Sequence, residues 1–305
     1  MDDLEEIKKL LIGLARGQEK QFGSLIDLAF EDNDSQICGY FMKVDPNGRP
    51  RVNELISLIA NKITDFAIPR SKINRAVKRL NEDGSTEEIT SLALEAKGLF
   101  TSLEKSGEGG ELLLFSLTES VLKYPQILCK MHLKTDEEMH VHGADGVFLG
   151  VDDNKNLCVF WGESKLHNNH ASALAECIES IEPILKMEQQ IESDIRLMDY
   201  IDLDNCELEQ AICDYFDYTS PQYEKLRYCA ICLVSFDHTA YSNQPNKNEH
   251  IKLKIESDYQ SFWKKNLQQK IIEKGLENYK IIFFYLPIPS VSEFRICLLY
   301  TSDAA

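Results

Sequence analysis

The chain has 305 residues, with 33 Lys and Arg against 50 Asp and Glu, which gives a formal net charge of −17. This length suits two domains of about 150 residues each or one large α/β domain. With 43% hydrophobic residues the chain can bury a sizeable core. Its charge argues against a protein that coats DNA, RNA or anionic membranes by bulk electrostatic attraction.

Helical periodicity dominates the first third of the sequence. The spacing of apolar residues predicts helices over residues 2–16, 52–66, 70–81 and 86–103. A short extended piece over residues 37–44 ends at the turn signal Asp-Pro-Asn-Gly, and glycines cluster in a linker-like run at residues 105–110. We therefore expect a mainly helical N-terminal region over residues 1–105.

The pattern changes after residue 105, where strands and helices alternate. The predicted strands cover residues 126–134, 140–152, 156–165, 228–236 and 280–286, and the predicted helices cover residues 111–123, 171–198, 208–216 and 257–279. Helices that bracket strands in this way predict an α/β domain over residues 106–305, with a central mixed β-sheet flanked by helices. The last eight residues, LLYTSDAA, resemble translated sequencing-adapter sequence rather than the end of a folded element.

Three features indicate a cytoplasmic protein. The first residues, MDDLEEIKK, are acidic where a signal peptide needs a basic start and an apolar core. The most apolar short run, residues 281–289, is far below the ~18 residues needed to span a bilayer. The nine scattered cysteines indicate reduced thiols. Cys229 and Cys232 form one CxxC in a strand-like run without a second pair, so we expect core residues rather than a zinc site.

The informative segment is residues 140–165, in which a polar turn at residues 152–156 joins two apolar strands. Such a pattern predicts a β-hairpin. If the turn is symmetric about Asn154, Asp145 lies opposite Glu163, with their Cβ atoms roughly 5 Å apart. Lys165 follows two residues later and points to the same face. The hairpin therefore gathers two carboxylates and an ammonium group at one end.

Two converging carboxylates bind a hard divalent cation such as Mg²⁺ or Mn²⁺ through oxygen ligands. A neighbouring lysine can orient a water molecule or offset charge in a transition state. The pattern of Asp145, Glu163 and Lys165 thus favours metal-assisted phosphodiester hydrolysis. The alternative is an ordinary salt-bridged hairpin end at the surface, which explains most random matches to this pattern.

Four runs of the sequence, in this order, carry a family resemblance: GELLLFSLTESVL, LCKMHLKT, HVHGADGVFLG and WGESK. They resemble the nuclease subunit of the Hachiman anti-phage defence system, the HamA family, a branch of the PD-(D/E)XK nuclease superfamily. The resemblance implies a metal-dependent DNase effector encoded beside a superfamily 2-type helicase partner, HamB. It also implies that Asp145 and Glu163 bind the metal, that Lys165 is the catalytic lysine, and that Glu111 is an assisting acid. The proline of the superfamily motif is absent, since Ala144 precedes Asp145.

Other residues near this segment have two readings each. Lys130 and Lys134 share one face of a predicted strand and are candidates to bind a substrate phosphate, or they are solvated edge lysines. His140 and His142 have the spacing of some zinc ligands, but the register puts them on the opposite face, which favours packing.

Two rival functions remain at this point. One is a non-catalytic interaction subunit that only holds the helicase, which the intact set of Asp145, Glu163 and Lys165 disfavours. The other is a stand-alone, restriction-type nuclease. A contact surface for the helicase is expected in the N-terminal third or on the long helix after Lys165.

Overall fold

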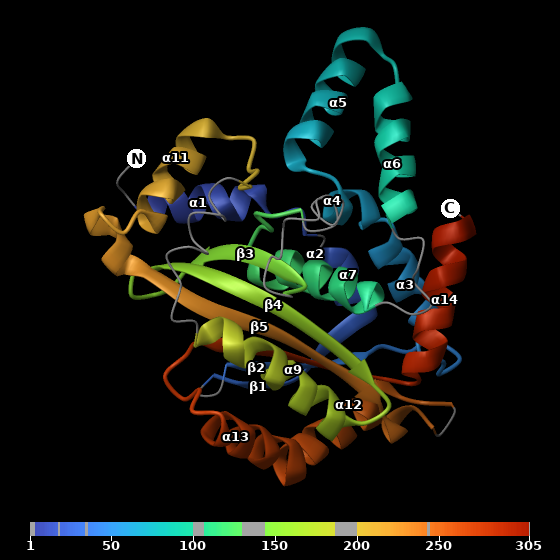
Figure 1. The fold of residues 1–305 in the computed structure, drawn as a ribbon. Coiled ribbons are helices and arrows are strands. Elements are labelled where there is room, and N and C mark those ends of the chain that lie inside the picture. The colour runs from blue at the N-terminus through green and yellow to red at the C-terminus, as the bar shows by residue number, and fades with distance from the viewer. Residues whose placement is uncertain are drawn as a thin grey trace.

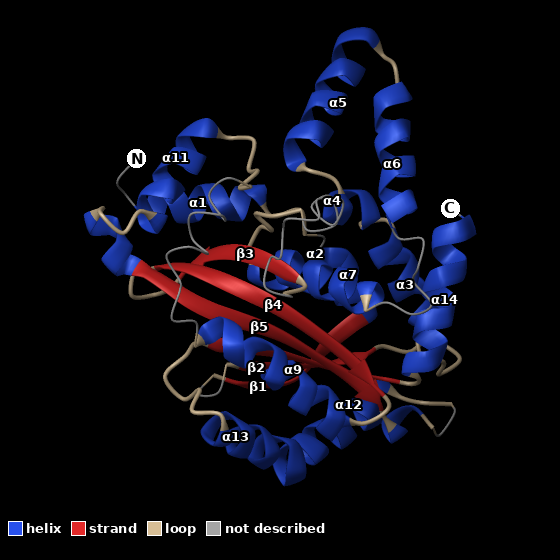
Figure 2. Cartoon of the chain, in the orientation of Figure 1, coloured by secondary structure: helices blue, strands red, loops and turns tan. Residues whose placement is uncertain are grey.

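A mixed six-stranded β-sheet organises the computed structural model, which describes residues 4–17, 19–33, 36–99, 107–129, 144–186, 200–242 and 245–304. The strand order is β1–β2–β6–β5–β4–β3. Helices lie on both faces of the sheet (Figure 1 and Figure 2), so the predicted fold class is confirmed. The strands are β1 (Ile26–Asp32), β2 (Ile37–Met42), β3 (Gly146–Val151), β4 (Leu157–His167), β5 (Leu226–Asp237) and β6 (Ile281–Ile288).

The centre of the sheet is parallel and its two outer pairs are antiparallel. Strands β2, β6, β5 and β4 run parallel to one another, whereas β1 pairs with β2 and β3 pairs with β4 in antiparallel fashion. Parallel strands are covered on both faces, so their sequences are continuously apolar.

Cys229 and Cys232 lie buried in β5, as expected of core residues, and none of the nine cysteines is in a disulfide.

The helices form two layers around the sheet. Before β3 the chain forms α1 (Leu4–Leu14), α2 (Glu19–Leu25), α3 (Val52–Ala60), α4 (Ile63–Ala67), α5 (Arg70–Asp83), α6 (Glu87–Leu99), α7 (Glu108–Leu117) and the π-helical turn η1 (Thr118–Leu122). After β4 it forms α9 (His170–Leu185), α11 (Cys206–Phe216), η2 (Pro221–Lys225), η3 (Thr239–Tyr241), α12 (Asn248–Asp258), η4 (Tyr259–Trp263), α13 (Lys264–Glu273) and α14 (Val291–Ala304). Figure 1 shows α9, α12 and α13 on one side of the sheet and α3, α7 and α14 on the other, while α5 and α6 project from the body.

The first third of the chain contributes to the sheet, which the sequence indicated only for residues 37–44. Strand β1 was not predicted, because its run Ile26–Asp32 carries acidic residues and its pairing with β2 shifts between Leu28 and Phe30. Such a bulge breaks the alternation of period two by which a strand is recognised. The sheet thus draws strands from both sides of the boundary predicted at residues 105 and 106, and that boundary stays a prediction.

Several predicted elements have other limits in the structure. The predicted helix 52–66 is two helices, α3 and α4, and the helix predicted from residue 257 already begins at Asn248. Within the described part of the predicted strand 126–134, only Gln126 forms a β-bridge, with Phe148. Helix α9 ends at Leu185, and residues 187–199 of its predicted extension lie outside the described residues. Helix α14 runs into the LLYTSDAA segment, so the expectation that this segment is not part of a folded element is wrong.

None of the described helices is both long enough and apolar enough to cross a membrane.

Candidate active site

The β3–β4 hairpin has the register that the symmetric turn predicted. Gly146 pairs with Gly162 and Val151 pairs with Leu157, with the four pairs between them in sequence. The ladder begins at Gly146, and the backbone N–H of Asp145 donates to the carbonyl oxygen of Gly162 at 2.8 Å. Asp145 therefore lies where the pairing of the hairpin begins, beside the residue that precedes Glu163.

The carboxylate of Asp145 is fixed by the residue that follows Glu163. Its Oδ2 atom accepts hydrogen bonds from the backbone N–H of Ser164 at 2.8 Å and from the Ser164 hydroxyl at 2.6 Å. Asp145 is half-buried, whereas Ser164 is 7% exposed. Ser164 thus holds the first acid against β4 and leaves it partly accessible to solvent.

Glu163 and Lys165 form a close ion pair on the same face of β4. Lys165 Nζ lies 2.6 Å from Glu163 Oε1, and the Glu163 side chain is only 4% exposed against 26% for Lys165. On this face Cys177 of α9 donates its thiol to the Glu163 carbonyl oxygen at 3.5 Å. The acid is therefore enclosed by α9 while the lysine reaches toward the surface.

The three groups interact electrostatically, which shows that the structure brings them together. Burial raises the pKa of the Glu163 carboxyl, and the negative charge of Asp145 raises it further, against the opposing effects of Lys165 and Ser180. Burial acts to lower the pKa of Lys165, but the hydrogen bond and charge of Glu163, together with the charge of Asp145, raise it overall. The two carboxylates repel each other, and one protonated lysine offsets this repulsion only in part. A further bound cation would reduce it.

The donor set fits a hard divalent cation. Glu163 Oε2 is buried and accepts no hydrogen bond from the residues that the structure describes. Within the same residues no group of three or more His, Cys, Asp and Glu side chains is placed to hold a metal ion. A cation here would thus be bound through the two carboxylates, and oxygen ligands of this kind suit Mg²⁺ or Mn²⁺.

A cavity of about 260 Å³ opens beside Lys165. Its lining includes residues from four elements: Gly109 and Gly110 of α7, Ser164, Lys165 and His167 of β4, Glu176 of α9, and Arg295 of α14. Sequence reasoning did not select Ser164 or Arg295 for the site. Ser164 stands between the two candidate residues Glu163 and Lys165 of the WGESK run, and that position was the one available signal for it.

Glu111 lies in the first turn of α7 and is 8% exposed. The preceding residue, Gly110, packs directly against β4, since a Cβ atom built on it would lie 2.8 Å from Ser164 Oγ. The structure thus places the turn that carries Glu111 at the Asp145 end of the hairpin. The role of Glu111 as an assisting acid stays a prediction.

The other candidate residues, Lys130, Lys134, His140 and His142, lie outside the described residues. Their predicted roles stay predictions.

The fold and this site define an α/β protein with a mixed sheet that carries an acid pair and a lysine at one hairpin end. A family model described as HamA matches residues 20–298. The chain therefore belongs to the HamA family and is a Hachiman defence-associated protein. A comparison with curated protein sequences gives no match.

The raised pKa of Glu163 predicts a specific pH dependence of stability. A carboxyl whose pKa is higher in the folded state stabilises the fold while it is protonated, and this contribution is lost as the pH rises from the ordinary value of 4.5 through the folded pKa. We expect Glu163→Gln, compared with the parent in EDTA, to gain relative stability across this window. Urea denaturation at a series of pH values measures the difference, and a difference independent of pH would contradict the electrostatic description of the site.

Proposed function

We propose that this protein is the DNase effector of a Hachiman anti-phage defence system and hydrolyses phosphodiester bonds of DNA with a divalent cation. The observation that supports this is the meeting of Asp145, Glu163 and Lys165 at one end of a hairpin, beside a cavity. A merely structural ion pair needs no second acid, yet Asp145 raises the pKa of the carboxyl that Lys165 already neutralises. A cation that enters the site would be attracted by both carboxylates.

In this mechanism Asp145 and Glu163 would hold the cation, and Glu163 Oε2 is buried and accepts no hydrogen bond from the described residues. A divalent cation bound there would polarise a phosphoryl oxygen and lower the pKa of a water molecule. Ser164 keeps the Asp145 carboxylate in place through two hydrogen bonds, so the ligand geometry is set before substrate binds.

Lys165 supplies positive charge at the wall of the cavity. Because its pKa is raised above the ordinary value of 10.5, the ammonium group stays protonated at neutral pH. It can therefore donate to a phosphate oxygen or to the attacking water, but it cannot act as a base. Stabilisation of developing charge by such a pre-positioned group is typically a large part of catalysis.

The first prediction concerns these side chains. We expect Lys165→Ala and Glu163→Gln to lower the rate of DNA cleavage on the order of 10²-fold or more. The first variant removes the ammonium group that would stabilise the reacting phosphate, and the second removes a carboxylate that would bind the cation. Cleavage of plasmid and linear DNA on agarose gels, with circular dichroism as the check of folding, measures the effect. The exposed turn of the same hairpin provides matched controls, Asp153→Asn and Lys155→Gln, which should cut like the parent. Cleavage by folded Lys165→Ala at the parent's rate would show that the site is misassigned.

The second prediction follows from the type of ligand atoms. EDTA should stop cleavage, and Mg²⁺ or Mn²⁺ should restore it, because both cations prefer oxygen ligands. The same cations should raise the melting temperature of the parent but not of Glu163→Gln, which gives a readout independent of activity. Full activity of metal-stripped protein in EDTA, or a requirement for zinc, would refute the proposed cation.

The proposed partner is a superfamily 2-type helicase of the HamB kind, which forms a complex with this chain in the cytoplasm. A body of charge −17 repels DNA, so autonomous capture of substrate is poor. A nuclease without sequence readout also endangers its own host unless its access to DNA is controlled. Both arguments favour a nuclease subunit over a stand-alone, restriction-type enzyme.

The third prediction tests this partnership. Co-expression with the neighbouring helicase should give a complex that survives affinity purification and leaves intact duplex DNA uncut. ATP and a helicase substrate should then activate cleavage by the complex but not by its Lys165→Ala form. A pull-down without helicase, combined with unrestrained cutting by the isolated chain, would favour the stand-alone nuclease. Complex formation without cleavage under any condition would favour the non-catalytic interaction subunit.

A further inference from the structure

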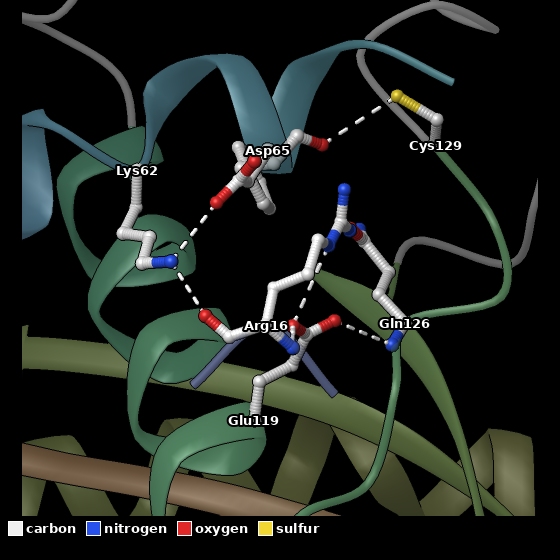
Figure 3. A network of polar contacts seen from close by, with 7 residues as sticks. Arg16, Lys62, Asp65, Glu119, Gln126 and Cys129 are labelled. Carbon is white, nitrogen blue, oxygen red and sulfur yellow. Dashed lines mark hydrogen bonds and ion pairs between the residues drawn. The ribbon is translucent and has the colours of Figure 1, made fainter. Parts of the chain in front are cut away.

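A second cluster of charged side chains lies beside the middle of β3, around the buried residue Glu119 of η1. Glu119 is 1% exposed and accepts hydrogen bonds from the backbone N–H groups of Arg16, at 2.6 Å, and of Gln126, at 3.0 Å. The Arg16 guanidinium lies 3.5 Å from the same carboxylate and stacks over the ring of Phe115. Figure 3 shows Arg16 between Asp65 of α4 and Gln126.

Arg70, the first residue of α5, faces the same cluster. Its side chain is only 8% exposed, and its Nε and Nη2 atoms are buried without a hydrogen-bond acceptor among the described residues. Burial lowers the pKa of Arg70, the positive charge of Arg16 lowers it further, and Glu119, Asp202 and Asp65 oppose these effects. The two guanidinium groups are therefore close enough to repel each other.

The acids near the cluster already have other partners. Asp65 pairs with Lys62 at 2.9 Å, and Glu119 is shared between Arg16 and two backbone donors. Asp202 accepts hydrogen bonds from the backbone and hydroxyl of Ser71. One guanidinium charge thus remains without a close carboxylate in the described part of the chain, and a buried charge of this kind is unfavourable unless a ligand compensates for it.

The unused donors have the chemistry of an oxyanion site. Nε–H and Nη2–H of Arg70 form the planar fork that binds two oxygens of a phosphate or carboxylate. Arg16 Nη1 and Gln126 Nε2 are also buried and without acceptors among the described residues. These four donors come from three side chains on different segments of the chain. A carboxylate presents its acceptor sites in one plane, whereas a tetrahedral phosphate presents oxygens in several directions and suits such a set of donors better.

We propose that Arg16, Arg70 and Gln126 bind a phosphate group, either that of a small phosphate compound or that of a DNA strand end. A phosphate group can reach these donors from solvent at Arg16, because 18% of the Arg16 side chain is exposed. The proposal does not depend on the nuclease function, although the two sites share β3. Gln126 bridges to Phe148, three residues after Asp145, which places the sites about 10 Å apart along the strand.

The test uses inorganic phosphate and the full chain. Phosphate should raise the melting temperature above its value in chloride at equal pH and ionic strength, because a ligand of the folded state stabilises it. Titration followed by ³¹P NMR should give binding that is about tenfold or more weaker in Arg70→Lys, which keeps the charge but lacks the fork. Gln126→Met is a second variant that retains the backbone bond to Glu119 and should fold while binding phosphate more weakly.

Two control variants separate this site from other basic groups. Arg75→Gln and Lys78→Gln alter exposed basic residues of the same helix, and both should bind phosphate like the parent. A parent without a phosphate-specific shift, or a shift retained in both Arg70→Lys and Gln126→Met, would overturn the proposal. So would a shift lost in both Arg75→Gln and Lys78→Gln. Competition by a 5′-phosphorylated oligonucleotide but not by its 5′-hydroxyl form would identify a strand end as the ligand, and competition by neither would identify a small phosphate compound.

Discussion

The burial of one carboxylate, that of Glu163, is the constraint on which the arrangement of the site depends. Its strand, β4, has a neighbour on each side, and α9 covers the face that carries the side chain. An ionised acid in such surroundings is costly unless cations compensate for it. Lys165 supplies one compensation at 2.6 Å, yet Asp145 adds a second negative charge at the same end of the hairpin. These three side chains therefore bring two carboxyl groups and one ammonium group together at the same place, the arrangement on which the proposed cation site rests.

The glycines at the start of α7 make this arrangement sterically possible. A side chain on Gly110 would lie 2.8 Å from Ser164 Oγ and 2.9 Å from the Leu166 side chain, so it would force α7 away from β4 or displace Ser164. Ser164 in turn holds the Asp145 carboxylate. A run that reads as a linker in the sequence thus includes residues whose small size positions the first acid of the site.

The sequence predicted the parts of the site that depend on local pairing. A polar turn between two apolar strands determines the register of β3 and β4, and the period of two then determines which side chains share a face. The remaining parts depend on contacts between distant segments. Arg295 donates to the Leu166 carbonyl oxygen across 129 residues, and Arg16 meets Glu119 across 103. Strand β1 was missed for a different reason, because its bulge and acidic residues hide the alternation of period two.

The distribution of positive charge bears on how a substrate reaches the site. Helix α5 is the most basic segment of the described chain, but Lys72 pairs with Glu95 and Arg79 with Glu88 of the adjacent α6. Lys165 is likewise paired, and the guanidinium groups of Arg16 and Arg70 are largely buried. Basic groups held in this way act at contact distance and add little to long-range attraction, which a net charge of −17 opposes throughout. For the proposed DNase, selection of DNA would thus have to precede its arrival at the cavity, and the proposed helicase partner would suit that step.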